Sequence, residues 1–134
     1  MQLTHQEIYD QVCAHLAKQG RRSMIPINGK AICAYRGNGG TKCAVGALIP
    51  DELYTAKLEG VRIIDDPVKV AVFGTSTPPL KTLQLLNILQ SIHDEASLRG
   101  RYSTVELIRR QLAYTAKQYF LTVGAEEAIT DWTF

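Results

Sequence analysis

Residues 24–35 read MIPINGKAICAY and decide the fold class, because they contain the strongest short hairpin signal in the chain. Asn28 and Gly29 both accept positive φ angles, so they predict a two-residue turn between the flanking apolar runs. Pro26 has no backbone N–H, which predicts a short strand at the edge of a sheet. A two-stranded ribbon is marginally stable alone, so we expect this hairpin to pack against helices.

Three long amphipathic helices are predicted around the hairpin, with apolar residues that recur at the 3.6-residue helical period. Each follows a start signal: a capping box at Thr4 and Glu7, the pair Pro78-Pro79, and a second capping box at 103–106. The predicted helices run over residues 5–19, 80–95 and 104–121, with Gly20 as the stop signal of the first.

The region between the hairpin and the second long helix predicts shorter elements. A short helical stretch begins near Lys42 and is interrupted at Pro50. Residues 61–64 are rich in β-branched side chains and predict a third strand. Asp66-Pro67 is typical of an N-cap and first helical position, so we expect VKVAVF to be a helix, although its β-branched residues are also typical of a strand.

The composition predicts one soluble globular domain over residues 1–134, of the α+β class and mostly helical, with four to five helices and a small antiparallel β-hairpin. The net charge of +2 favours no particular class of partner. No apolar run approaches the roughly 20 residues that span a bilayer, and the N-terminus does not resemble a signal peptide. We therefore expect a cytoplasmic protein without membrane contact.

The three cysteines, Cys13, Cys33 and Cys43, are an odd set, and their spacing contains no C-x-x-C half-site. Reduced thiols are expected, and neither a metal nor a cofactor is predicted. Cys13 falls on the apolar stripe of the first helix, where a small core residue is the simplest interpretation.

The loop from Arg36 to Lys42, RGNGGTK, is the first candidate site. Its glycines let backbone N–H groups turn toward a ligand, Asn38 lies among them, and Arg36 and Lys42 bracket the loop with positive charge. These features favour an anion site, although the loop lacks the residues of a Walker A motif. The alternative is a connector with solvated basic ends. Arg21 and Arg22 join this basic group only if the fold brings them close.

Cys43 is the second candidate, because it lies beside Lys42 in the predicted first turn of a helix, where a thiolate is favoured. Such a thiol can act as a nucleophile with His93 as its base. Two features favour a core cysteine instead. Asp94 follows His93 directly and points about 100° away on a helix, and the residues after Cys43 are apolar.

Arg109 is the third candidate, because it falls inside the apolar stripe of the last long helix. One interpretation is an arginine whose stem covers apolar surface while its head reaches water. The other is an inward arginine paired with Asp51, Glu59 or Asp94, or with an anionic ligand. The sequence leaves both open.

Motifs within residues 33–54 and 89–94 resemble those of a group of short uncharacterised proteins of tailed phages. The shared motifs are Cys-x-Tyr-Arg-Gly, Lys-Cys-Ala-x-Gly, Ile-Pro-Asp-x-x-Tyr and Leu-Gln-x-Ile-His-Asp, within residues 1–95. In that group we expect a tryptophan soon after the His-Asp pair, whereas the only tryptophan here is Trp132. The resemblance implies a bacterial host cytoplasm during infection, and action on host machinery or host defence.

Two functions are carried forward from the sequence. The first is a phage-type accessory protein that binds and inhibits a host defence protein, or sequesters a small anionic ligand, through the segment Tyr35–Glu59. Tyr35 would stack on the ligand, Arg36 and Lys42 would neutralise its charge, and the glycine loop would supply backbone donors. The acidic residues Asp51 and Glu59 would position these basic groups. The alternative is a small cysteine-dependent hydrolase or transferase. Nucleic-acid binding through the loop arginines is possible but not favoured.

Overall fold

The computed structural model describes residues 3–94 and 104–132, and within these ranges the chain forms five α-helices and one two-stranded sheet. The helices are α1 (His5–Gln19), α2 (Ala44–Leu48), α3 (Asp66–Phe73), α4 (Leu80–Asp94) and α5 (Thr104–Gln118), and the strands are β1 (Met24–Ile27) and β2 (Lys30–Cys33). The predicted mostly helical α+β class is confirmed.

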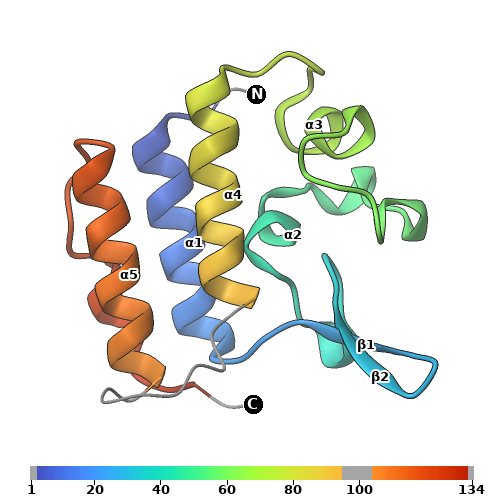
Figure 1. Cartoon of the computed structure of the whole chain (residues 1–134), viewed down its shortest axis with the longest axis horizontal. Helices are drawn as coiled ribbons and strands as arrows, with labels where there is room; N and C mark the ends of the chain where they lie inside the picture. Colours follow the sequence, from blue (N-terminus) through green and yellow to red (C-terminus); the bar gives the residue numbers. More distant parts are fainter. Residues whose placement is uncertain (1–2, 95–103, 133–134) are drawn as a thin grey trace.

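The three long helices α1, α4 and α5 lie side by side, and α2, α3 and the hairpin lie on the far side of α4 from α5 (Figure 1). The apolar stripe predicted for α1 is buried throughout: Ile8, Tyr9, Val12, Cys13 and Leu16 are each fully inaccessible. Leu85, Leu86 and Leu89 of α4 and Ile108 and Leu112 of α5 complete this part of the core. Burying each such side chain contributes about 1.5–3 kcal/mol, which makes this layer the principal source of stability.

The predicted ends of α1 are confirmed. The Glu7 N–H donates to Thr4 Oγ1 (3.0 Å), and the Thr4 N–H donates back to Glu7 Oε1 (2.9 Å). Gly20 ends the helix with a φ of 66°. The second predicted capping box cannot be compared, because Ser103 lies outside the described residues.

The hairpin has the predicted turn and register. Ile27 pairs with Lys30 and Met24 with Cys33, so Asn28 and Gly29 form the turn with φ angles of 52° and 78°. The ribbon projects from the helical body (Figure 1). Its base is tied to the body by the loop that follows β2.

Residues 61–64 are not a third strand, which corrects the prediction. The Asp65 N–H donates to the Arg62 carbonyl oxygen (3.0 Å) and closes a turn, while Ile63 is buried in the core. The Tyr35 N–H just beyond β2 donates to the Glu59 carboxylate and not to this segment. The β-branched run therefore packs its side chains without forming a ladder.

The segment VKVAVF is helical, as predicted, but its N-cap is Asp65 and its first residue is Asp66. The prediction placed the cap one residue later. The helix α4 begins at Leu80 directly after Pro78-Pro79, also as predicted.

The last long helix ends earlier than predicted, at Gln118 and not near Leu121. Phe120 adopts a left-handed conformation (φ 56°), and the Leu121 N–H donates to the Ala116 carbonyl oxygen (2.8 Å). This is the hydrogen-bond pattern of a Schellman stop, with phenylalanine where glycine is usual. Phe120 falls within the predicted range of this amphipathic helix and continues its apolar period, but its side chain is 96% exposed because the stop turns it outward.

The C-terminal tail folds back onto the helical body through a short 3₁₀ turn, η4 (Ala125–Ala128), that packs against α1. Tyr9 donates its hydroxyl proton to the buried Glu126 carboxylate. Burial raises the pKa of Glu126, but this bond together with backbone N–H donors and the charge of Arg109 lowers it by more. The ring of Trp132 meets the His93 ring edge to face, with centroids 5.9 Å apart. Trp132 is thus distant from His93 in sequence but packed against it in space.

Candidate functional site

The loop between Arg36 and Lys42 is closed at its base. Arg36 and Lys42 form an antiparallel bridge, and the Gly37 N–H donates to the Thr41 carbonyl oxygen (2.8 Å). The tip is a 3₁₀ turn, η1 (Asn38–Gly40), in which Gly39 and Gly40 have φ angles of 70° and 75°. The loop is therefore a defined structure that presents peptide groups at its surface, and not a loose connector.

Glu59 fixes the start of this loop. Its carboxylate accepts hydrogen bonds from the Tyr35 N–H (2.9 Å), the Arg36 N–H (3.1 Å) and the Tyr54 hydroxyl (2.6 Å). Burial, followed by the bond to Glu59, raises the pKa of Tyr54 to about 12. Glu59 thus positions the backbone of the basic loop, which agrees with the positioning role expected from the sequence.

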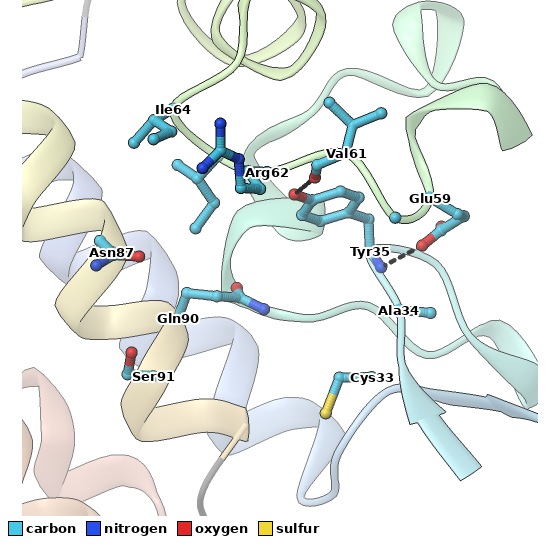
Figure 2. Close-up of a pocket in the computed structure, with 12 residues that line it drawn as sticks. Cys33, Ala34, Tyr35, Glu59, Val61, Arg62, Ile64, Asn87, Gln90 and Ser91 are labelled. Atoms are coloured by element: carbon cyan, nitrogen blue, oxygen red, sulfur yellow. Dashed lines mark hydrogen bonds between the residues drawn. The ribbon is translucent and has the colours of Figure 1, made fainter. Parts of the chain in front are cut away.

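Tyr35 does not present its ring for stacking, which corrects the expectation. The side chain is 8% exposed, and its hydroxyl donates to the Val61 carbonyl oxygen. Figure 2 shows the ring beside Val61, at the wall of a cavity of about 450 Å³ between α4 and the 59–64 loop. We call this the neutral cavity, because Glu59 and Arg62 balance in charge. Its other lining residues are Cys33, Ala34, Gly60, Val61, Ile63, Ile64, Asn87, Gln90 and Ser91.

Arg36 is held by three contacts within the protein. Its guanidinium lies 2.9 Å from the Asp51 carboxylate, donates to the Ile49 carbonyl oxygen (2.7 Å) and stands over the Tyr54 ring at 4.8 Å. With its side chain only 18% exposed, Arg36 acts as a brace between the loop and the segment after α2. The expected role as a neutraliser of ligand charge does not fit this position.

Asp51 contacts both basic ends of the loop. Its Oδ1 lies 2.9 Å from Arg36 Nη1 and 3.4 Å from Lys42 Nζ. Lys42, and then the hydrogen bond from Arg36, lower the pKa of this carboxyl group. The pairing confirms that Asp51 positions the basic groups. It also leaves Lys42 only partly neutralised, because its contact is the longer one.

A second cavity, of about 350 Å³, lies between the C-terminal end of α1 and the glycine loop. Its lining is His15, Lys18, Gln19, Arg21, Gly39, Gly40, Thr41 and Lys42. Three of these side chains are cationic, and among the described residues none that lines the cavity is acidic. We call it the cationic cavity.

Two cations of the cationic cavity, Lys18 and Arg21, are exposed and form no ion pair within the described part of the chain. The Arg21 guanidinium lies over Gly39, where an added Cβ would come within 2.9 Å of Nη2. A larger residue at 39 therefore displaces the arginine from the rim of the cavity. Gly39 therefore lets the Arg21 guanidinium lie close to the backbone of the loop.

The two walls of the cationic cavity are joined at Lys42. Gln19 accepts from the Lys42 N–H (2.7 Å) and donates to the Lys42 carbonyl oxygen (2.9 Å), and His15 Nε2 donates to the same oxygen (2.8 Å). Since a carbonyl oxygen only accepts, His15 carries its proton on Nε2. Burial lowers the pKa of His15, the bond to Lys42 partly offsets this, and His93, Lys42 and Lys18 lower it further.

Cys43 and His93 are both fully buried, and neither lines the cationic or the neutral cavity. Cys43 is the N-cap of α2, where its Sγ accepts the Gly46 N–H at 3.2 Å. His93 lies under Trp132. Cys13 is likewise a core residue, and burial raises the pKa of its thiol to about 12. The burial of Cys43 and His93 gives no support to catalysis, because a substrate would have to reach both groups.

Arg109 belongs to the C-terminal tail and not to the loop. Its Nε donates to the Ile129 carbonyl oxygen (2.7 Å) and its Nη2 to the Glu127 carbonyl oxygen (3.0 Å). Of the two interpretations left open by the sequence, the pairing with Asp51 or Glu59 is not formed, since the guanidinium binds these carbonyl oxygens instead. Arg109 thus fastens η4 to α5.

The predicted site residues are therefore divided among several places. Lys42 lines the cationic cavity, Tyr35 and Glu59 line the neutral cavity, and Asn38 is exposed at the loop tip with its carbonyl oxygen accepting from Thr41. The sequence missed the contributions of His15, Lys18 and Gln19 to the cationic cavity. Their signal was the end of α1 at Gly20, directly before the noted Arg21.

No protein-family model, curated protein or solved structure matches this chain. The resemblance to phage proteins therefore stays a prediction. None of the helices in residues 3–94 and 104–132 has the length and apolar character needed to cross a membrane. The same residues contain no group of three His, Cys, Asp or Glu side chains placed to hold a metal ion.

Proposed function

We propose that this protein is a non-enzymatic binding protein whose ligand presents negative charge to the cationic cavity. The observation that carries the proposal is the set Lys18, Arg21 and Lys42 around one cavity whose described lining has no acidic side chain. A unit charge about 4 Å away contributes about 4 kcal/mol at an effective dielectric of about 20, before screening by salt. Solvent screens the exposed Lys18 and Arg21, and Asp51 partly neutralises Lys42, so the attraction is reduced, but the three cations together still favour an anion at this cavity.

The ligand is a small anion or an acidic group of a partner protein. In the setting that the phage resemblance implies, such a site serves to inhibit a host defence protein or to sequester its small anionic signal. The segment Tyr35–Glu59 contributes differently from the expectation. Its loop supplies Lys42 and the glycine backbone, while Arg36, Asp51 and Glu59 hold that loop in place.

The alternative enzymatic function gains no support from the site, because Cys43 and His93 are both fully buried. Nucleic-acid binding is also less favoured. The cations gather around one compact cavity and the net charge is only +2, whereas a nucleic-acid surface extends charge along a stripe.

The proposal is tested with two charge-reversal variants and two probes, sodium sulfate and a short glutamate-rich peptide. Arg21→Glu is expected to weaken binding of either probe at least about tenfold, which is about 1.4 kcal/mol. Lys57→Glu is the matched control, because Lys57 is exposed and lies outside both cavities. Binding is measured by isothermal titration calorimetry at constant ionic strength.

The control should bind like the unmodified protein, and both variants should keep its melting temperature because both sites are exposed. Added sodium chloride should weaken binding to the unmodified protein, as expected for exposed charges. If neither probe binds, or if Arg21→Glu binds as tightly as the unmodified protein, the cationic cavity is not the binding site.

A further inference from the structure

Among the described residues, His15 is the one histidine that lines the cationic cavity. It lies on the same face of α1 as Lys18, lines the cavity, and is only half-buried. Its Nε2 proton is fixed on the Lys42 carbonyl oxygen, so a second proton must go to Nδ1. The cavity therefore contains three permanent positive charges and a fourth that depends on pH.

We propose that the cavity selects a tetrahedral dianion, such as the phosphate group of a small phosphomonoester, and that His15 takes up a proton from solvent as this dianion binds. The inference rests on the proposed function, because it names the ligand class of the same cavity. It goes further by assigning His15 a positioning and charge-balancing role that binding of an anion alone does not require.

The charge balance favours a dianion over a monoanion. Lys18 and Arg21 contribute two positive charges without an ion-pair partner among the described residues, and Lys42 adds a third that Asp51 partly neutralises. The C-terminal end of α1 subtracts about half a charge, so close to two positive charges remain. The planar fork of Arg21 can pair with two oxygens of one phosphate, and the glycine backbone approaches it without side chains. A carboxylate satisfies only part of this set. The volume of about 350 Å³ lies near the lower end for ligand pockets, so the ligand is small.

The direction of the proton transfer follows from the groups around His15. Lys18 on the same helix, Lys42 on the facing loop and His93 on α4 all disfavour the imidazolium, and burial disfavours it most. Arg21 adds a further positive charge at the rim of the cavity. A bound dianion reverses the sign of the local field and favours the protonated ring. Because binding takes up a proton, affinity must rise as pH falls.

Sulfate is the probe because it stays doubly charged between about pH 6 and about pH 8. Any pH dependence of its binding therefore comes from the protein and not from titration of the ligand. Calorimetry with sodium sulfate at about pH 6 and about pH 8 should show binding about three- to tenfold tighter at the lower pH, within the limit of about tenfold per pH unit for one proton. Repeating the titration in buffers of different ionisation enthalpy measures the proton uptake directly. Sodium acetate should bind more weakly than sulfate. Adenosine monophosphate at about pH 8, where it is a dianion, should bind at least as tightly as sulfate.

The variant His15→Gln tests whether His15 is the residue that takes up the proton when sulfate binds. Glutamine can still donate to the Lys42 carbonyl oxygen but does not titrate. This variant should bind sulfate with the same affinity at both pH values. His5→Gln is the matched control at the other end of α1, where His5 contacts Thr82 at 2.8 Å, and it should keep the pH dependence. Circular dichroism verifies that both variants fold.

The outcomes separate the two proposals. Three results would overturn the role of His15. They are sulfate binding that is independent of pH, a binding enthalpy that does not change with the ionisation enthalpy of the buffer, and a pH dependence that persists in His15→Gln. Acetate binding as tightly as sulfate overturns the choice of a dianion, and both results leave the proposed function intact. If neither sulfate nor the glutamate-rich peptide binds at either pH, the proposed function itself is overturned.

Discussion

The neutral and the cationic cavity share the segment Tyr35–Glu59 as a wall, and the neutral cavity is the larger, at about 450 Å³ against about 350 Å³. In the neutral cavity Arg62 already has a partner, since its guanidinium meets both Asp65 oxygens at 3.2 Å (Figure 2 shows Arg62). In the cationic cavity Lys18 and Arg21 form no ion pair with any described residue. Size alone thus misleads here, and unbalanced charge is the better guide to a binding site.

Gly46 is a position where one substitution should displace the chain segment that lines both cavities. A Cβ at this position would lie 1.9 Å from the Tyr35 carbonyl oxygen, which also accepts the Cys43 N–H. Gly46→Ala must push the Tyr35 backbone away from α2, so we expect a loss of about 3 kcal/mol or more in the free energy of unfolding. Urea denaturation measures this loss. Ala47→Gly, in the same helix, should cost about 1 kcal/mol. Equal midpoints for Gly46→Ala and the unmodified protein would show that the backbone contact has been misplaced.

A variant at Glu59 should affect the two cavities differently, because Glu59 lines only the neutral one. Glu59→Ala leaves three donors without their acceptor, those of Tyr35, Arg36 and Tyr54, so we expect a loss of about 2 kcal/mol in urea denaturation. Glu52→Ala, at an exposed position, should change stability by less than about 0.5 kcal/mol. Sulfate affinity of the folded Glu59→Ala protein should fall less than that of Arg21→Glu, because Glu59 acts on the cationic cavity only by holding its loop in place. A loss of stability no larger than that of Glu52→Ala would contradict the anchoring role.

Asp51→Asn is expected to have the smallest effect of these variants, and the effect should be on sulfate affinity at the cationic cavity. Asp51→Asn removes the carboxylate that partly neutralises Lys42, so sulfate should bind about twofold more tightly. Asp65→Asn removes the partner of Arg62 beside the neutral cavity and should leave sulfate affinity unchanged. The same calorimetric titration measures both variants. Weaker binding by Asp51→Asn would mean that Asp51 matters more for placing Lys42 than for neutralising it.

Local signals were sufficient for most of the fold. The capping box at Thr4 and Glu7, the Asn28-Gly29 turn and the Pro78-Pro79 start each act within a few residues, and each formed as predicted. The errors came where distant contacts decide. Residues 61–64 had strand composition but form a turn, while the Tyr35 N–H beyond β2 is bound by Glu59. The helix α5 had the apolar period through Phe120, but a stop without glycine ended it.

The candidate site was predictable only in part. The glycine loop and Lys42 were found from composition, and the positioning role of Asp51 and Glu59 was anticipated. The cationic cavity was not found, because Gln19 and His15 bind the Lys42 backbone across more than 20 residues of chain. No local pattern encodes such a contact. Arg36 was misjudged for a related reason, since its acceptor at Ile49 is a backbone carbonyl that sequence does not mark.

The packing of Trp132 on His93 gives the chain an internal optical reporter. It is the only tryptophan in the sequence, and it belongs to the tail that Arg109 and Tyr9 hold against the helices. All tryptophan emission therefore originates beside one buried imidazole. Release of the tail would transfer the indole to water and shift its emission to longer wavelength, so attachment of the tail can be followed in the unlabelled protein.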